Sequence, residues 1–235
     1  MRSFVPQDSI PYLTHGEVYG AYAPGFIQRA QLWSIAVGAV DDPRRSWCEF
    51  GVGEGESLDW FASRKPRENL LIGFDSFEGI PEPWLVYPAG QWKTTPYQPN
   101  RDDVRIVAGR FEQTLGDPKL LEMLTPQLGL VHIDCDLYSA TKVVFGRLGE
   151  RFGPGTVVLF DEFFNYPEWM EHEAKAFREF VEERGVRFEY LVRTDGQLVL
   201  RILAVGVEPE WSIRPIDASC IDPVLILGFK SPMVF

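Results

Sequence analysis

The chain has 235 residues, 45% of them hydrophobic and 24% charged, and its 34 acidic and 23 basic side chains give a formal net charge of −11. This apolar content excludes a wholly disordered chain, and the length suits one α/β domain. Because an acidic chain without basic runs repels phosphate backbones, nucleic acid is disfavoured as a partner and a small-molecule ligand is expected.

The chain carries no pattern of export or membrane insertion. Its three cysteines, Cys48, Cys135 and Cys220, are far apart and odd in number, which argues against a disulfide framework. The longest apolar runs have the length of a strand, and the first residues lack the pattern of a signal peptide. We therefore expect a reduced, cytoplasmic protein that contacts no membrane.

Apolar patterning predicts helices and strands in alternation. The first helix is expected to end near Gly38, and strands are predicted at residues 47–50, 70–74, 104–108, 128–133 and 156–160. Residues 169–184 have the spacing of an amphipathic helix, and residues 188–192 and 197–202 are predicted to pair as a hairpin. This order is typical of a doubly wound, Rossmann-like α/β fold with a mostly parallel sheet and an antiparallel end.

We expect a single domain over residues 1–235, made of three parts. These are an N-terminal helical or lid segment at 1–45, the Rossmann-like core at 46–203 and a C-terminal extension at 204–235. Residues 80–100, rich in proline and aromatic side chains, are predicted to form a loop, and we favour a lid over the substrate. The apolar residues 224–227 predict an edge strand or a subunit contact ahead of a part in the acceptor pocket, which leaves a homo-oligomer open.

The residues that follow the predicted strands are the candidates for binding, because ligands of open α/β sheets lie beyond the carboxyl ends of the strands. The first strand runs into Gly51, Gly53 and Gly55, where backbone without Cβ atoms can approach a ligand. This strict alternation differs from the Gly-x-Gly-x-x-Gly of dinucleotide sites, which disfavours NAD. Asp75, about 20 residues further along, can accept hydrogen bonds from a ribose; a turn cap is the structural alternative.

Four carboxylates follow the last two parallel strands: Asp134, Asp136, Asp161 and Glu162. Carboxylates brought together raise one another's pKa unless a cation neutralises them, and such oxygen donors suit Mg²⁺. The structural alternative is that some of them cap helices and face water. His132 is interpreted as a buried, hydrogen-bonded histidine rather than a general base. Cys135 is rejected as a nucleophile because neighbouring carboxylates suppress the thiolate.

Several motifs in this order resemble class I S-adenosylmethionine-dependent methyltransferases, and within them the macrocin O-methyltransferase (TylF-type) family. The resemblance covers roughly residues 25–203. Its most specific part is the Asp-x-Asp-Leu-Tyr segment that follows a Gly-Phe-Asp-Ser-Phe-Glu-Gly segment. The motifs are residues 49–55, 73–79, 109–111, 132–142 and 160–162.

This resemblance implies the seven-stranded class I methyltransferase sheet and an O-methyltransferase that acts on a hydroxyl of a small molecule, a sugar or glycosylated natural product. S-adenosylmethionine and Mg²⁺ are the implied cofactors. Asp136 is implied as the base that deprotonates the acceptor, with Asp134, Asp161 and Glu162 as metal ligands, although the family usually has aspartate at the last position. The implied cofactor-binding residues are Glu49, Gly51, Gly53, Gly55, Ser57, Asp75, Ser76, Gly109, Arg110, Phe111 and Asp134.

Other functions remain open at this point. An NAD-dependent oxidoreductase is favoured only by the formal Tyr138-x-x-x-Lys142 spacing. A non-catalytic S-adenosylmethionine-binding protein is disfavoured, because such a protein would not need the carboxylates that follow the last two parallel strands. The main alternative is a metal-independent N- or carboxyl-methyltransferase of the same fold, which insensitivity to EDTA would reveal.

Overall fold

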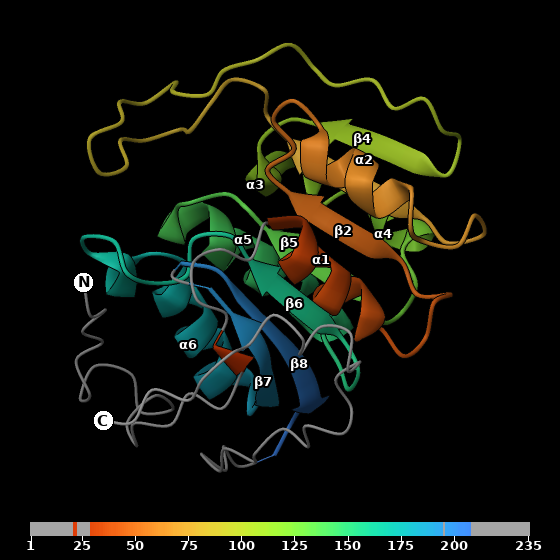
Figure 1. The fold of residues 1–235 in the computed structure, drawn as a ribbon. Coiled ribbons are helices and arrows are strands. Elements are labelled where there is room, and N and C mark those ends of the chain that lie inside the picture. The colour runs from red at the N-terminus through yellow and green to blue at the C-terminus, as the bar shows by residue number, and fades with distance from the viewer. Residues whose placement is uncertain (1–20, 23–28, 195, 208–235) are drawn as a thin grey trace.

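The computed structural model describes residues 21–22, 29–194 and 196–207, which form one sheet covered by helices on both faces (Figure 1). The sheet has eight strands in the order β1-β7-β8-β6-β5-β2-β3-β4. The strands are β1 (Ala21–Tyr22), β2 (Trp47–Phe50), β3 (Leu71–Asp75), β4 (Val104–Ala108), β5 (Leu130–Ile133), β6 (Val157–Phe160), β7 (Arg187–Arg193) and β8 (Leu198–Ala204).

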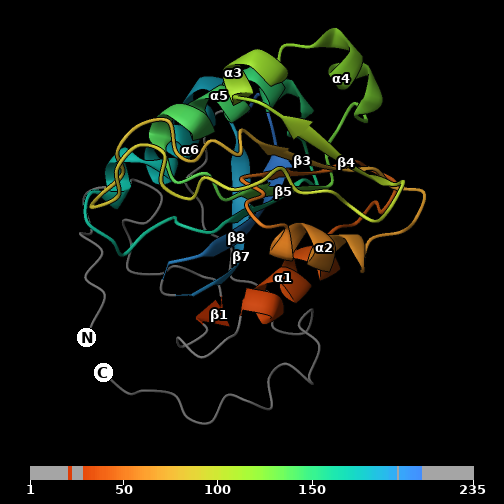
Figure 2. The same cartoon turned by 90° about the horizontal axis from the view of Figure 1, so that it is seen from above.

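The helices lie in two layers, as the view from above shows (Figure 2). Helices α1 (Arg29–Gly38) and α2 (Glu56–Ala62) cover one face of the sheet. The other face carries α3 (Phe111–Thr114), α4 (Pro118–Met123), α5 (Tyr138–Leu148) and α6 (Glu173–Arg184). Short 3₁₀ turns at Gly149–Arg151 and Trp169–Glu171 follow α5 and precede α6.

Two hydrophobic cores explain this layering, because successive side chains of a strand point to opposite faces of the sheet. Along β2, Trp47 packs in the core beneath α1 and α2, whereas Cys48 and Phe50 pack in the core beneath α5 and α6. All four residues of β2, β5 and β6 are buried. Strands covered on both faces read as continuous apolar runs, which is why the sequence pattern predicted them.

The strand order reverses between β2 and β5. After β2 the chain proceeds outward to β3 and β4, then returns to place β5 parallel to β2 on its other side. At such a switch point the connections leave in opposite directions, which opens a crevice beyond the strand ends. The glycine loop after β2 and the Asp134–Asp136 segment after β5 therefore lie side by side.

The predicted class I methyltransferase fold is confirmed. Seven strands form the expected sheet, β8 is antiparallel to both β6 and β7, and the two-residue β1 adds a parallel edge beside β7. The single helix predicted at 169–184 is instead interrupted at His172, whose φ of −111° and ψ of −127° are not helical. Residues 224–227 lie outside the described residues, and no described helix is long and apolar enough to cross a membrane.

Candidate functional site

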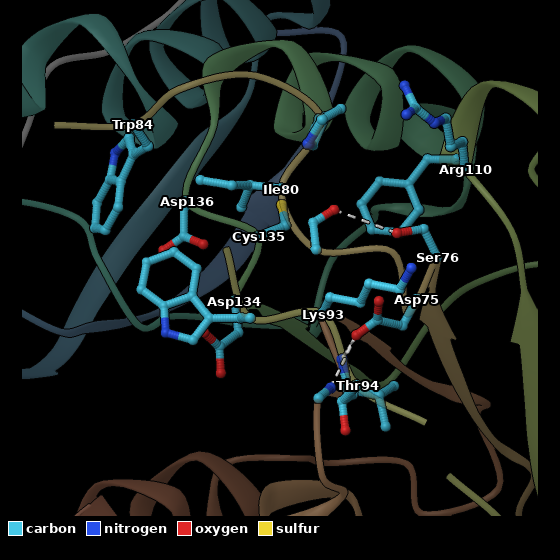
Figure 3. A pocket seen from close by; sticks show the side chains of 18 of the residues that line it. Asp75, Ser76, Ile80, Trp84, Lys93, Thr94, Arg110, Asp134, Cys135 and Asp136 are labelled. Carbon is cyan, nitrogen blue, oxygen red and sulfur yellow. Dashed lines mark hydrogen bonds between the residues drawn. The ribbon is translucent and has the colours of Figure 1, made fainter. Parts of the chain in front are cut away.

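A cavity of about 730 Å³ opens at the switch point, beyond the carboxyl ends of β2, β3 and β5 (Figure 3). Its volume is within the range of small-molecule and cofactor sites. The glycine loop, the end of β3 and the β4–α3 turn line one side together with Lys93 and Thr94, and the aromatic residues of the 80–100 loop line the other. Of the predicted site residues, the lining includes Gly51, Gly53, Asp75, Ser76, Gly109, Arg110, Phe111, Asp134, Asp136 and Glu162.

Asp75 organises the glycine loop. The backbone N–H groups of Val52 and Gly53 each donate to its Oδ2 at 2.8 Å, and the N–H of Phe77 donates to Oδ1 at 2.7 Å. The same carboxylate therefore caps the turn after β3 and holds the loop after β2. Asp75 also lines the cavity, so capping and ligand binding are compatible roles for this residue.

Gly51 allows the loop to lie directly against the end of β5. Its φ is +96°, and a Cβ atom there would be 1.7 Å from the carbonyl oxygen of Asp134. Any side chain would push the two strand ends apart. Gly53, at φ +52°, has nothing within 4 Å of such a Cβ position, so it presents bare backbone to the cavity.

Three of the predicted cofactor-binding residues do not line the cavity. Glu49 is fully buried, and its Oε1 accepts a hydrogen bond of 2.7 Å from Ser57 Oγ at the start of α2. Gly55 lies beneath the ring of Tyr97, whose atoms approach its Cβ position to 2.5 Å. The structure thus places Glu49, Gly55 and Ser57 behind the loop as its support.

The carboxylates after β5 and β6 lie close together, and their electrostatics differ. Burial, followed by the charge of Asp161, raises the pKa of Asp136 to about 7. Burial and the charge of Asp134 raise the pKa of Glu162. Although burial opposes ionisation of Asp161, its pKa is lowered because His132 and Arg29 are positive neighbours. The cluster therefore combines one carboxylate whose pKa is lowered with two whose pKa is raised.

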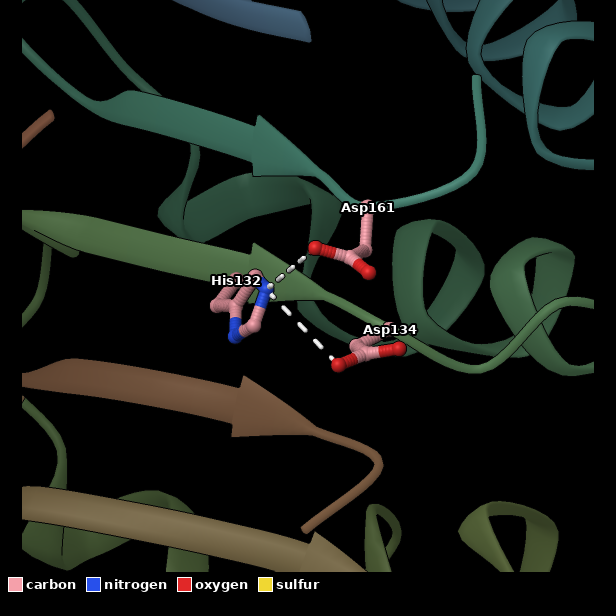
Figure 4. Close-up of side chains that lie close together, drawn as sticks. All are labelled: His132, Asp134 and Asp161. Carbon is pink, nitrogen blue, oxygen red and sulfur yellow. Dashed lines mark ion pairs between the residues drawn. The ribbon is translucent and has the colours of Figure 1, made fainter. Parts of the chain in front are cut away.

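Asp134 and Asp161 face the imidazole of His132 (Figure 4). His132 Nε2 is 4.0 Å from Asp134 Oδ2 and 4.0 Å from Asp161 Oδ1. One potential ligand atom from each of these residues lies within 4.8 Å of the other two. Burial opposes the charged imidazole, yet the hydrogen-bonding and charged contacts of Asp161 and Glu49 raise the pKa of His132 to about 10.

Arg29 lines the cavity, and the sequence analysis did not name it. Its Nη2 donates to Asp161 Oδ2 and lies 3.5 Å from Asp134 Oδ2, so α1 delivers a cation to the same carboxylates. The guanidinium also lies 5.6 Å from the ring of Trp33, four residues along the helix. Arg29 precedes the buried Trp33 by four residues, so the two lie on the same side of α1. This i, i+4 spacing is the sequence signal from which the position of Arg29 could have been predicted.

Glu173 is a second residue that was missed. It begins α6, is fully buried, and its Oε1 accepts from the backbone N–H groups of Cys135 at 3.4 Å and Asp136 at 3.2 Å. Asp136 has a φ of +62°, in the left-handed region that aspartate enters more readily than most residues, and the contact with Glu173 holds its backbone there. Glu173 shares a helix face with the core residues Phe177 and Phe180, which was the available sequence signal.

An aromatic wall made by Trp84, Tyr87 and Trp92 closes the other side of the cavity. The rings of Tyr87 and Trp92 are 4.6 Å apart, and Trp92 remains 47% exposed. Trp84 is buried and contacts the ring of Tyr166 at 5.5 Å, which joins the wall to the segment after β6. Figure 3 shows Trp84 on the same side of the cavity as Asp136. The 80–100 loop thus presents a cavity-facing apolar surface, as a lid over a substrate requires.

The Tyr138 and Lys142 pair lies away from this chemistry, whereas Cys135 lines the cavity. Tyr138 and Lys142 both contact Glu179 on α6, with Tyr138 Oη donating at 2.9 Å and Lys142 Nζ lying at 2.8 Å, and neither lines the cavity. Because both side chains lie outside the cavity, the structure does not support the hydride-transfer role that an NAD-dependent oxidoreductase would require of them. Burial and the charge of Glu173 raise the pKa of the Cys135 thiol, which agrees with its rejection as a nucleophile.

The sequence matches a known protein family over the segment that builds the site. Residues 48–163, from β2 to just beyond β6, match the family described as a methyltransferase domain. Residues 48–163 form a methyltransferase domain. The matched segment contains the glycine loop, Asp75 and all four carboxylates of the site. A comparison with curated protein sequences found no significant match.

Solved structures of methyltransferases share the fold. The crystal structure of the calicheamicin methyltransferase CalS11 has a TM-score of 0.56 and 22% identity, covering 74% of this chain and 77% of that one. Another structure of CalS11, named as a TDP-rhamnose 3′-O-methyltransferase, has a TM-score of 0.53 and 23% identity, covering 74% and 78%. The O-methyltransferase NovP has a TM-score of 0.55 and 18% identity, covering 75% and 80%.

Proposed function

We propose that this methyltransferase transfers the methyl group of S-adenosylmethionine to a hydroxyl of a sugar or glycosylated natural product, with the assistance of Mg²⁺. The observation that carries the proposal is the single cavity in which the Gly51–Gly53 loop and Asp75 meet Asp134, Asp136 and Glu162. The named activities of CalS11 and NovP, both O-methyltransferases, support the hydroxyl as acceptor. The narrower resemblance to the TylF-type family supports the same substrate class.

The cofactor is proposed to occupy the side of the cavity formed by the glycine loop. Gly53 offers open backbone there, and Asp75 keeps acceptor capacity beyond the three N–H groups that it already binds. Asp75 is proposed to accept from the ribose, and Ser76, Gly109, Arg110 and Phe111 to flank the adenine. Phe111 is held by the ring of Phe50 at 5.5 Å. When bound, S-adenosylmethionine supplies an electrophilic sulfonium methyl group.

The acceptor is proposed to lie between the aromatic wall and Asp136. Aromatic rings offer flat, apolar surfaces that suit the face of a sugar ring or an aromatic aglycone. Asp136 is the proposed base, because a pKa of about 7 lets its carboxylate take a proton from the acceptor hydroxyl near neutral pH. Glu173 keeps the Asp136 backbone in place, and the wall excludes water from the transfer.

Asp134, Asp161 and Glu162 are the proposed Mg²⁺ ligands. The donor set fits a hard cation because it offers carboxylate oxygens, and Glu162 Oε2 is buried without a hydrogen-bond partner among the described residues. When bound, Mg²⁺ lowers the pKa of the acceptor hydroxyl. One observation favours the metal-independent alternative, since the Arg29 guanidinium already neutralises Asp161.

Calorimetric titration with S-adenosylhomocysteine, repeated with Mg²⁺ and with EDTA, tests the proposal without knowledge of the acceptor. Micromolar binding is expected, and a screen of acceptors with labelled S-adenosylmethionine then identifies the hydroxyl. Absence of binding would contradict the assignment of the glycine loop and Asp75. Methyl transfer that persists undiminished in EDTA would replace the metal-assisted mechanism with the metal-independent one.

A further inference from the structure

Gly55 is predicted to contact the cofactor, but the structure gives it a different partner. It precedes α2 with a φ of +87°, and a Cβ atom there would be 2.5 Å from the ring of Tyr97. A side chain at this position would be strained by its backbone conformation and would also displace the tyrosine ring. Gly55 does not line the cavity, so the need for glycine here comes from Tyr97, a residue of the 80–100 loop.

The Tyr97 side chain ties this loop to α2. Its hydroxyl donates to Asp59 Oδ1, four residues after Gly55, and its ring packs against the core beneath α1 and α2. Burial and the hydrogen bond to Asp59 raise the pKa of Tyr97 to about 12, so the hydroxyl keeps the proton that it donates. Within the described part of the chain, this is the one hydrogen bond found for residues 95–100.

The tie holds the segment that covers the proposed cofactor side of the cavity. Lys93 and Thr94, which shortly precede Tyr97, line the cavity on the side of the glycine loop and Asp75 (Figure 3). The backbone N–H of Thr94 donates to the carbonyl oxygen of Phe77 at 3.2 Å. The covering segment is therefore held at two points, one just after β3 and the other on α2.

We propose that Tyr97 is a positioning residue that latches the 80–100 loop onto the glycine loop, and that this latch must open for the cofactor to enter and to leave. The latch consists of the Tyr97 ring on Gly55 and the Tyr97 hydroxyl on Asp59. The inference rests on the proposed cofactor site and adds a residue that touches no reacting atom. Because Asp59 is exposed, water can replace the hydroxyl when the latch opens, so opening is compatible with turnover.

A second tie of the same kind provides a matched control. Ser139 Oγ, at the start of α5, donates to Glu82 Oε1 at 2.6 Å. Both ties are exposed hydrogen bonds between a hydroxyl and a carboxylate, but this one joins the loop to the opposite face of the sheet. Glu82 lies two residues before Trp84, on the proposed acceptor side, so its loss should leave exchange of the cofactor unaffected.

Surface plasmon resonance of the immobilised protein, with S-adenosylhomocysteine in solution, measures association and dissociation rate constants separately. We expect Tyr97→Phe, which removes only the hydroxyl, to raise both constants by about fivefold and to leave their ratio within about twofold. Asp59→Ala should have the same effect, and the double variant should add little to it, because both changes break one bond. Glu82→Ala should leave both constants within about twofold of the wild-type values.

Trypsin cleavage after Lys93 reports on the latch without any ligand, because proteolysis requires local opening of the loop. Tyr97→Phe is expected to speed this cleavage by about fivefold, while urea unfolding shows that the variant remains folded. Unchanged cleavage, or unchanged rate constants in both Tyr97→Phe and Tyr97→Ala, overturns the inference. A rise in the dissociation rate constant alone also overturns it, because that result makes Tyr97 a contact of the cofactor. If the wild-type protein binds no S-adenosylhomocysteine but Tyr97→Phe still speeds cleavage, the proposed cofactor site fails and the tie between the loop and α2 stands.

Discussion

Replacement of Asp75 by alanine separates the glycine loop from the end of β3. The carboxylate accepts three backbone N–H groups, from Val52, Gly53 and Phe77, at 2.7–2.8 Å. A hydrogen bond contributes about 1 kcal/mol net to stability, and somewhat more when the acceptor is charged. We therefore expect Asp75→Ala to lower the free energy of unfolding by about 3 kcal/mol, a large part of what a domain of this kind possesses.

The asparagine variant gives a graded comparison. Asp75→Asn keeps one acceptor oxygen for two of the donors but turns an NH₂ group toward the third, so a loss of about 1 kcal/mol is expected. Urea unfolding followed by circular dichroism measures both values. Asp102→Ala is the matched control, because that side chain is 92% exposed and its ion pair with Arg67 contributes little.

Affinity for S-adenosylhomocysteine tests the binding role of the same residue. If Asp75 accepts from the ribose, Asp75→Ala lowers this affinity by at least about tenfold at a temperature where the variant is still folded. A variant with the wild-type urea midpoint would refute the structural reasoning. Wild-type affinity in a destabilised variant would instead leave Asp75 as a turn cap and remove it from the cofactor site.

Three further perturbations follow from the site. Burial and a neighbouring carboxylate raise the pKa of Asp136 to about 7. Because the base must be ionised, the rate of methyl transfer should fall as the pH drops through that value. A pH profile without this fall, or normal turnover by Asp136→Asn, would exclude the residue as base. Gly51→Ala should yield little folded protein because its Cβ would be 1.7 Å from the Asp134 carbonyl oxygen, whereas Gly38→Ala, with nothing within 4 Å, should fold normally, as circular dichroism and yield will show. Trp92→Ala should leave the thermal unfolding midpoint within about two degrees of the wild-type value, since the ring is 47% exposed. The same change should raise the KM for the identified acceptor by about tenfold. An unchanged KM would place the acceptor elsewhere.

The sequence by itself determined the order and type of most elements. Buried strands such as β2 and β5 are apolar runs interrupted by one polar residue each, Glu49 and His132, and the strands of a doubly wound sheet can be recognised from such runs without knowledge of their neighbours. The residues that follow each strand, including Asp75 and Asp134, are then known to share one edge of the sheet. This local logic predicted the fold and the cavity-lining part of the candidate site.

Only the tertiary structure decided which side chains meet. The pairing of β5 with both β2 and β6 places His132 between Glu49 and Asp161, residues that are distant in the chain. The burial of Glu173 at the start of an amphipathic helix and the reach of Arg29 to Asp161 depend in the same way on how α6 and α1 pack on the sheet. Such contacts result from strand order and helix packing over the whole chain, and hydrophobic periodicity within a short window carries no information about them.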